Sequence, residues 1–321
     1  MTNDSLKPAR TEPTVSLLGC GWLGVALAPA LMERGFFVRG STTRPARLSV
    51  LSSIDVEPHL LRIDPLEADT EPTGDPTAGD SSIARFFGSD TLVINMPPET
   101  AMGADYHPSQ VREILSRAGD HVRHILYVSS TSVYGASQGT VDETTTPKPD
   151  AGSGEILLKA EELIAEFVAR TAATGSRSVS ATIVRSAGLI GPGRHPGLFL
   201  AGRKNVANGD SPVNMIHQLD LVQILVSLIA DHVPAAGRVE IYNAVSTDHL
   251  SRREFYTRAA VAVGVVPPTF AVESPSDSTP ASQTKLVNSV RVSGLVSLVL
   301  KNQDLLASMG ARASTEGLWQ S

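Results

Sequence analysis

Three glycines spaced as G-x-G-x-x-G, namely Gly19, Gly21 and Gly24, are the residues whose spacing most clearly predicts a chemistry. An apolar run, residues 14–18, precedes them, and a helix-like stretch, residues 23–34, follows. Between a strand and a helix, this spacing is typical of a loop that binds a dinucleotide. The first glycine permits a tight turn, the second lets the backbone approach a diphosphate, and the third allows close helix packing. We therefore expect a dinucleotide to bind here.

The end of the second predicted strand indicates which dinucleotide is bound. An NAD site usually has an Asp or Glu about 20 residues after the glycines, where it accepts a hydrogen bond from the ribose 2′-hydroxyl. This chain instead has Gly40-Ser41-Thr42-Thr43-Arg44. Hydroxyls and a guanidinium suit a 2′-phosphate, which takes charge-assisted hydrogen bonds. The segment favours NADP, with NAD as the alternative; Arg44 as an ordinary solvated loop residue is the other interpretation.

Composition limits the class of protein. At 321 residues, the chain has room for one large α/β domain with a smaller appendage. Its net charge of −6 argues against a nucleic-acid partner. Cys20 is the single cysteine, which excludes an intramolecular disulfide, and we interpret it as a small buried residue rather than a redox group.

The sequence contains no signal for a membrane span, a signal peptide or a metal site. No apolar run reaches membrane-spanning length, and residues 1–12 lack the apolar region of a signal peptide, so we expect a cytoplasmic protein without a membrane partner. No spacing of His, Cys, Asp and Glu suggests a metal site.

Apolar strand-like segments alternate with helix-like segments, which predicts βαβ units and a parallel sheet. Two polar stretches, residues 65–82 and 136–154, are predicted to be loops. The predicted strands are 14–18, 36–38, 59–63, 91–95, 125–128, 181–184 and 239–243, and the predicted helices are 23–34, 105–119, 155–169 and 219–230.

This alternation predicts an α/β fold, a Rossmann-type doubly wound parallel sheet with a small C-terminal substrate lobe. Residues 1–12 are predicted to form a disordered tail, and residues 13–190 the dinucleotide-binding domain. Residues of about 214–246 are expected to return to that domain, because a strand at 239–243 should join the main sheet. The substrate lobe is then predicted to comprise residues 191–213 and 247–321.

Four segments, taken in order, resemble the extended short-chain dehydrogenase/reductases of the NAD(P)-dependent epimerase/dehydratase family. The first is the glycine loop, and the second, residues 129–135, resembles the family's S-S-x-x-V-Y-G stretch. Residues 185–193 resemble its R-x-x-x-x-x-G-P-G segment, and residues 214–221 its I-H-V-x-D segment. The resemblance covers roughly residues 14–245, with weaker similarity to residue 310.

The resemblance implies a catalytic role for one serine. It also implies that this chain lacks the family's usual proton donor. It places Ser130 where the family hydrogen-bonds the reacting oxygen, with Ser132 as a possible assistant; a hydrogen-bonded turn is the structural alternative. The family's Tyr-x-x-x-Lys pair, aligned on Ala160-Glu161, falls on Ser153 and Leu157. The chain is therefore predicted to lack that pair.

A small atypical subgroup of the family resembles this chain more closely. It shares the G-C-G-W-L-G loop, a Thr-Thr-Arg after the second strand and a Pro-Pro after the fourth, here Pro97-Pro98, and it also lacks the pair. Two functions follow from the resemblance. One is an NADP-dependent oxidoreductase or sugar-nucleotide epimerase/dehydratase-like enzyme with altered catalytic residues, and the other is a non-catalytic NADP(H)-sensing or binding protein.

Three further residues are candidates for the substrate. Arg194 could meet an anionic substrate group, although a solvated loop arginine is equally consistent with its position. His217 could be a proton carrier, but we favour a structural role at a strand-to-helix junction; Asn214 lies in the same segment. We expect a small-molecule substrate, and both a monomer and a homodimer are consistent with the sequence.

The predicted cofactor contacts, many of them at strand ends, are Gly19, Gly21, Trp22, Leu23, Gly24, Thr42, Thr43, Arg44, Asp64, Asn95, Met96 and Pro97.

Overall fold

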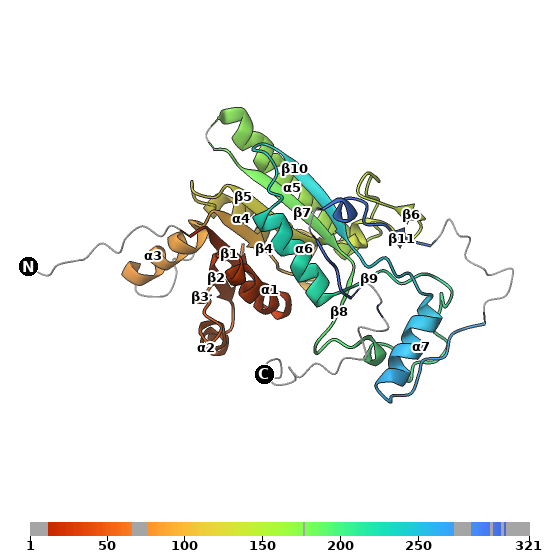
Figure 1. The fold of residues 1–321 in the computed structure, drawn as a ribbon. Coiled ribbons are helices and arrows are strands. Elements are labelled where there is room, and N and C mark those ends of the chain that lie inside the picture. The colour runs from red at the N-terminus through yellow and green to blue at the C-terminus, as the bar shows by residue number, and fades with distance from the viewer. Residues whose placement is uncertain are drawn as a thin grey trace, which may run out of the picture.

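Seven strands form one parallel sheet in the order β10-β7-β5-β4-β1-β2-β3 (Figure 1). The computed structural model describes residues 12–65, 76–175, 177–272, 284–295, 298–302 and 305. The order reverses between β1 and β4, which is the point where doubly wound sheets bind their ligands. The strands are β1 Thr14–Leu18, β2 Phe37–Thr42, β3 Glu57–Leu60, β4 Thr91–Ile94, β5 His124–Ser130, β7 Ser180–Ser186 and β10 Val239–Ala244.

Helices cover both faces of the sheet. Helices α1 (Trp22–Glu33) and α6 (Gln218–Ala230) pack together on one face, and α4 (Tyr106–Arg117) and α5 (Ser153–Thr174) pack together on the other (Figure 1). Strands covered on both sides are expected to be apolar throughout, and every residue of β4 and of β7 is buried. Further helical segments are α2 Leu48–Ser52, α3 Pro76–Phe87, η1 Pro45–Arg47, η2 Thr100–Met102 and η3 Thr131–Val133.

A smaller lobe lies beyond the carboxyl ends of the central strands. In it, β8 (Gly188–Ile190) pairs with β9 (Met215–His217), and η4 (Pro196–Leu198) packs on α7 (Arg252–Ala262). The lobe has its own apolar cluster, which consists of Ile190, Val213, Phe255, Tyr256, Phe270 and Leu305. A second small pair, β6 Thr140–Val141 with β11 Leu286–Val287, and the turn η6 Val292–Gly294 complete the described elements.

The predicted fold class is confirmed, with local corrections. The prediction of a loop over 65–82 is wrong for residues 76–82, which belong to α3. The aromatic side chains Phe86 and Phe87 at the end of α3 are buried in the core, and such tertiary packing stabilises a helix that composition alone does not favour. The third strand is shifted toward the N-terminus, and α7 was not predicted.

Some predictions fall outside the described residues. They concern residues 1–11 of the predicted tail, residues 66–75 of the predicted loop, and much of the substrate lobe after residue 272. The domain boundaries stay predictions. No helix within the described ranges has both the length and the apolar character to cross a bilayer.

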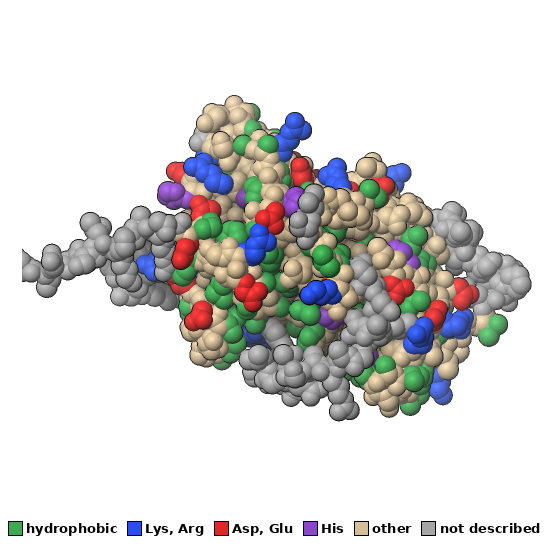
Figure 2. All heavy atoms as spheres, in the orientation of Figure 1, with side chains coloured by type: hydrophobic (Ala, Val, Ile, Leu, Met, Phe, Trp, Pro, Cys, Tyr) green, Lys and Arg blue, Asp and Glu red, His purple; other side chains and the backbone are tan. Residues whose placement is uncertain are grey.

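Surface charge is mixed on the face seen in Figure 2. Acidic and basic side chains lie interspersed there over the sheet domain and over the smaller lobe. Exposed charges of mixed sign are screened within about 10 Å at moderate salt. The electrostatics of a bound ligand on this side are therefore set by the residues that touch it.

Candidate functional site

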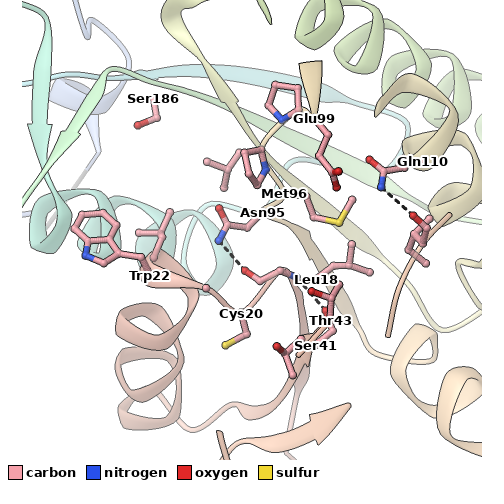
Figure 3. A pocket seen from close by; sticks show the side chains of 18 of the residues that line it. Leu18, Cys20, Trp22, Ser41, Thr43, Asn95, Met96, Glu99, Gln110 and Ser186 are labelled. Atoms are coloured by element: carbon pink, nitrogen blue, oxygen red, sulfur yellow. Dashed lines mark hydrogen bonds between the residues drawn. The ribbon is translucent and has the colours of Figure 1, made fainter. Parts of the chain in front are cut away.

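A cavity of about 820 Å³ opens at the carboxyl ends of β1, β2, β4, β5 and β7 (Figure 3). This volume lies within the usual range of small-molecule and cofactor sites. The cavity occupies the point where the strand order reverses. It brings together most of the predicted site residues, namely Gly19, Gly21, Trp22, Leu23, Thr42, Thr43, Arg44, Asn95, Met96, Pro97, Ser130 and Arg194.

The turn after β1 requires a glycine at its first position. Gly19 has a φ of +85°, and a Cβ on it would collide with the backbone carbonyl of Asn95. Its N–H donates to Ser41 Oγ at 3.0 Å, and its carbonyl accepts from Asn95 Nδ2 at 3.2 Å (Figure 3). Hydrogen bonds to β2 and to the loop after β4 therefore fix this turn on both sides.

The second and third glycines have different reasons to be small. A Cβ on Gly21 would meet only the Gly19 carbonyl oxygen, at 4.0 Å, so the space above it is open. A Cβ on Gly24 would lie 3.2 Å from Cys20 Sγ, which is tighter than ordinary packing. The space above Gly21 is thus available to a ligand, whereas the small size of Gly24 serves the packing of α1.

The N-terminus of α1 suits an anion. Gly21 precedes the helix and provides no capping side chain, and the first turn contains no acidic residue. The first N–H groups of a helix have no intrahelical acceptor, and they carry the positive end of the helix dipole. A diphosphate placed over Gly21 would accept from these groups.

Cys20 is a packing residue. It is 2% exposed, and a Cβ on Gly40 of β2 would lie 3.2 Å from its sulfur. Burial raises the pKa of the Cys20 thiol to about 12, so the reactive thiolate is disfavoured.

Three arginines that follow β2 and β3 line the cavity. Arg44 and Arg47 follow β2, and Arg62 follows β3. The backbone N–H of Arg44 donates to Thr42 Oγ1 at 3.2 Å, which shapes the turn that carries both of the first two arginines. Sequence reasoning missed Arg47 and Arg62. Asp64 does not line the cavity; its carboxylate lies 3.8 Å from Arg62 Nε.

Hydroxyl groups line the floor beyond β5 and β7. Ser130 Oγ accepts from the backbone N–H of Ser132 at 3.1 Å, so its own hydrogen can be donated elsewhere. The Ser132 hydroxyl is buried, has no hydrogen-bond partner among the described residues and does not line the cavity. Ser186 at the end of β7 and Leu157 of α5 also face the cavity.

A buried ionic network supports this floor from below. Ser129 Oγ donates to Glu161 Oε1 at 2.6 Å, and Arg185 Nη2 lies 2.6 Å from Glu161 Oε2. Arg185 Nη1 also donates to the hydroxyl of Tyr134 at 2.8 Å, and that hydroxyl lies 3.1 Å from Asn243 Oδ1. Burial raises the pKa of Tyr134. This phenol is therefore engaged within the core and does not line the cavity.

A different phenol does line the cavity. Tyr106, at the start of α4, is among the lining residues, and so is Glu99. Burial raises the pKa of Tyr106, and the nearby carboxylates of Asp64 and Glu99 add to that effect. In Figure 3, Glu99 lies to one side of Asn95, and Trp22 lies to the other.

Two predicted substrate residues have structural partners instead. Asn214 Nδ2 donates to the Lys285 carbonyl at 2.9 Å, and its Oδ1 accepts from the Val287 N–H at 2.8 Å. His217 Nδ1 accepts from the Leu219 N–H at 3.3 Å and so caps α6. Desolvation lowers the pKa of His217, and Asp220 partly offsets this shift. Neither Asn214 nor His217 lines the cavity.

Comparison with curated proteins finds similarity to the YeeZ protein of Escherichia coli. No family model matches the chain. The YeeZ protein of Escherichia coli (strain K12) is 34% identical over 259 residues, which cover 80% of this chain and 86% of that protein.

Solved structures share the fold at lower identity. A functionally unknown conserved protein from Silicibacter pomeroyi DSS is 24% identical with a TM-score of 0.67, covering 93% of this chain and 97% of that one. UDP-N-acetylglucosamine 4-epimerase from Bacillus cereus is 13% identical with a TM-score of 0.68, covering 93% and 97%. UDP-glucuronic acid 4-epimerase from Bacillus cereus, in complex with NAD, is 16% identical with a TM-score of 0.67, covering 94% and 99%. The fold is thus that of epimerase-like Rossmann proteins.

Proposed function

The chain belongs to the family of the YeeZ protein, and from this premise we propose that it binds NADP(H) in the cavity and uses it in catalysis. The activity is that of an NADP-dependent oxidoreductase or of a sugar-nucleotide epimerase/dehydratase-like enzyme. The observation that carries the proposal is the open space above Gly21, which faces an uncapped N-terminus of α1 at the switch point of the sheet.

The residues present fit a phosphorylated dinucleotide. The glycine turn and the first turn of α1 would hold its diphosphate. Arg44 and Arg47, together with the hydroxyls of Thr42 and Thr43, would hold the 2′-phosphate, since all four belong to the short segment that ends β2 and all line the cavity. None of the residues in the turn Thr42–Arg47 is acidic. This segment therefore favours NADP over NAD.

Replacing Arg44 by alanine tests the choice of nucleotide. Hydrogen bonds to charged groups are worth roughly 1.5–3 kcal/mol, so Arg44→Ala should weaken NADPH binding about 10- to 100-fold. The affinity for NADH should change little. Isothermal titration calorimetry of both nucleotides measures this, with Arg258→Ala, an exposed arginine of α7 paired with Glu254, as the control. Equal losses for both nucleotides, or tighter binding of NADH by the wild type, would remove the 2′-phosphate assignment.

The nicotinamide, when bound, supplies hydride transfer to or from a carbon of the substrate. The chain's own contribution begins with Ser130, whose hydroxyl hydrogen is not used by its contact with Ser132 and can be donated to the substrate oxygen. The apolar side chains of Val128, Leu157 and Ala187 also line the cavity. Apolar surroundings strengthen a hydrogen bond such as the one that Ser130 would donate.

A second candidate function is a binding protein that senses NADP(H) without turnover. Ser153 and Leu157 occupy the positions where the resemblance places a catalytic Tyr and Lys, and the Tyr134 hydroxyl is held by Arg185. Any turnover must then take its proton from another group, such as Tyr106 or water. The two candidates differ in whether hydride transfer occurs at all.

Turnover distinguishes the two candidates. We expect NADPH oxidation or product formation with at least one member of a panel of carbonyl compounds and sugar nucleotides. Ser130→Ala should lower kcat/KM about 10- to 100-fold, whereas Ser116→Ala, on the exposed side of α4, should not. Tight NADPH binding with no turnover across the panel would instead favour the binding protein.

A further inference from the structure

Arg194 is an exposed cation on the wall of the cavity, next to the glycine turn. It follows the sequence Gly191-Pro192-Gly193, and its Cζ lies 4.8 Å from the centre of the Trp22 ring. Within the described ranges, no carboxylate forms an ion pair with it. Its charge is therefore available to a ligand that enters the cavity.

The Trp22 ring is held firmly beneath this guanidinium. Its Nε1 donates to the Pro192 carbonyl at 2.7 Å, and the Trp22 carbonyl accepts from Gln218 Nε2 at 2.8 Å. Gly191 has a φ of +146°, and a Cβ on it would lie 3.4 Å from the ring, so a glycine suits this close approach. The backbone N–H of Arg194 closes the turn onto the Gly191 carbonyl at 2.9 Å.

This arrangement places Arg194 on the same cavity that the glycine turn lines. Trp22 is the first residue of α1 and directly follows Gly21, above which the space is open. A guanidinium stacked on a ring face keeps its N–H donors free at its edge. Arg194 and the first turn of α1 thus line one cavity and are connected through Trp22, and both favour an anion.

We propose that Arg194 binds the diphosphate of the dinucleotide, and that the Trp22–Arg194 stack clamps it from the smaller lobe. This inference rests on the proposed function, because it needs a dinucleotide in the cavity. It differs from the sequence-based prediction, which assigned Arg194 to the substrate. It also implies that dinucleotide binding fixes residues 191–194, which begin the predicted substrate lobe.

Comparing the affinities for three ligands isolates the contribution of the diphosphate from that of the rest of the nucleotide. NADPH and 2′-phospho-ADP-ribose both contain the diphosphate, whereas 2′-AMP contains the adenosine and the 2′-phosphate without it. Arg194→Ala should weaken the first two about tenfold each and leave 2′-AMP unchanged. Arg44→Ala should weaken all three. Arg203→Ala, an exposed arginine of the smaller lobe that does not line the cavity, is the matched control.

Calorimetry on the full chain measures these affinities, and thermal melting without ligand checks that each variant is folded. Arg194→Lys should recover part of the affinity, because it restores the charge without the planar stack. An unchanged affinity for NADPH in Arg194→Ala would overturn the clamp and leave the proposed function standing. Failure of the wild type to bind NADPH or 2′-phospho-ADP-ribose would overturn both proposals.

Discussion

Gly21→Val is expected to abolish dinucleotide binding while leaving the fold intact. A side chain at this position would project into open space, where a Cβ meets only the Gly19 carbonyl oxygen at 4.0 Å. The valine methyl groups would then occupy the approach of the diphosphate to the N-terminus of α1. We expect the affinity for NADPH to fall at least 100-fold, which corresponds to about 2.7 kcal/mol.

A matched change at Gly24 gives the opposite pattern and serves as the control. There, a Cβ would lie 3.2 Å from Cys20 Sγ, within the packing of α1 on the turn. Gly24→Val should therefore lower the melting temperature of the ligand-free protein, whereas Gly21→Val should not. Gly21→Ala, which adds only the Cβ, should lose less affinity than Gly21→Val. Unchanged NADPH binding in Gly21→Val by calorimetry would show that the phosphate site is misassigned.

The glycine turn could be predicted from sequence because its spacing pattern is local: the strand, the turn and the helix lie within residues 14–33. The contacts that require a glycine at position 19 are not local, since they come from Asn95, 76 residues further along the chain. The central strands were predicted for a similar reason, since burial on both faces makes them continuously apolar. The fold class therefore follows from short-range patterns.

The remaining lining residues depend on contacts between distant segments. Arg62 was not predicted because only the pairing of β3 with β2 brings its loop beside the turn after β2. Asn214 is directed away from the cavity by Lys285 and Val287, which lie 71 and 73 residues further along the chain. A single sequence contains no signal for such distant hydrogen-bond partners, so it could not show that Asn214 has a structural role rather than a role in substrate binding.

The contact between Trp22 and Arg194 also joins segments that are distant in sequence. Most strands of the central sheet lie between the two residues along the chain, and they meet because the segment after β8 returns to the N-terminus of α1. The sequence identified Arg194 as a candidate for an anionic group. The geometry adds that this guanidinium shares a cavity with the glycine turn, which is why we assign it to the diphosphate rather than to the substrate.

Breaking the Glu161–Arg185 pair is expected to destabilise the protein strongly. Both side chains are nearly inaccessible, at 4% and 3% exposure, and their closest atoms are 2.6 Å apart. Glu161→Gln would leave the Arg185 charge buried with only neutral partners, such as the Tyr134 hydroxyl. Removing one partner of a buried pair costs about 3–5 kcal/mol. Urea unfolding of the ligand-free protein measures this loss.

Two controls separate the charge effect from other consequences of the substitution. Glu113→Gln breaks an exposed pair with Arg117, also at 2.6 Å, and should cost no more than about 1 kcal/mol. Glu161→Met combined with Arg185→Met removes both buried charges, so the double variant should recover much of the stability lost in Glu161→Gln. A cost for Glu161→Gln no larger than that for Glu113→Gln would contradict the prediction. Because Ser129 donates to Glu161 and lines the cavity, the double variant should also lose ordering of the floor next to Ser130.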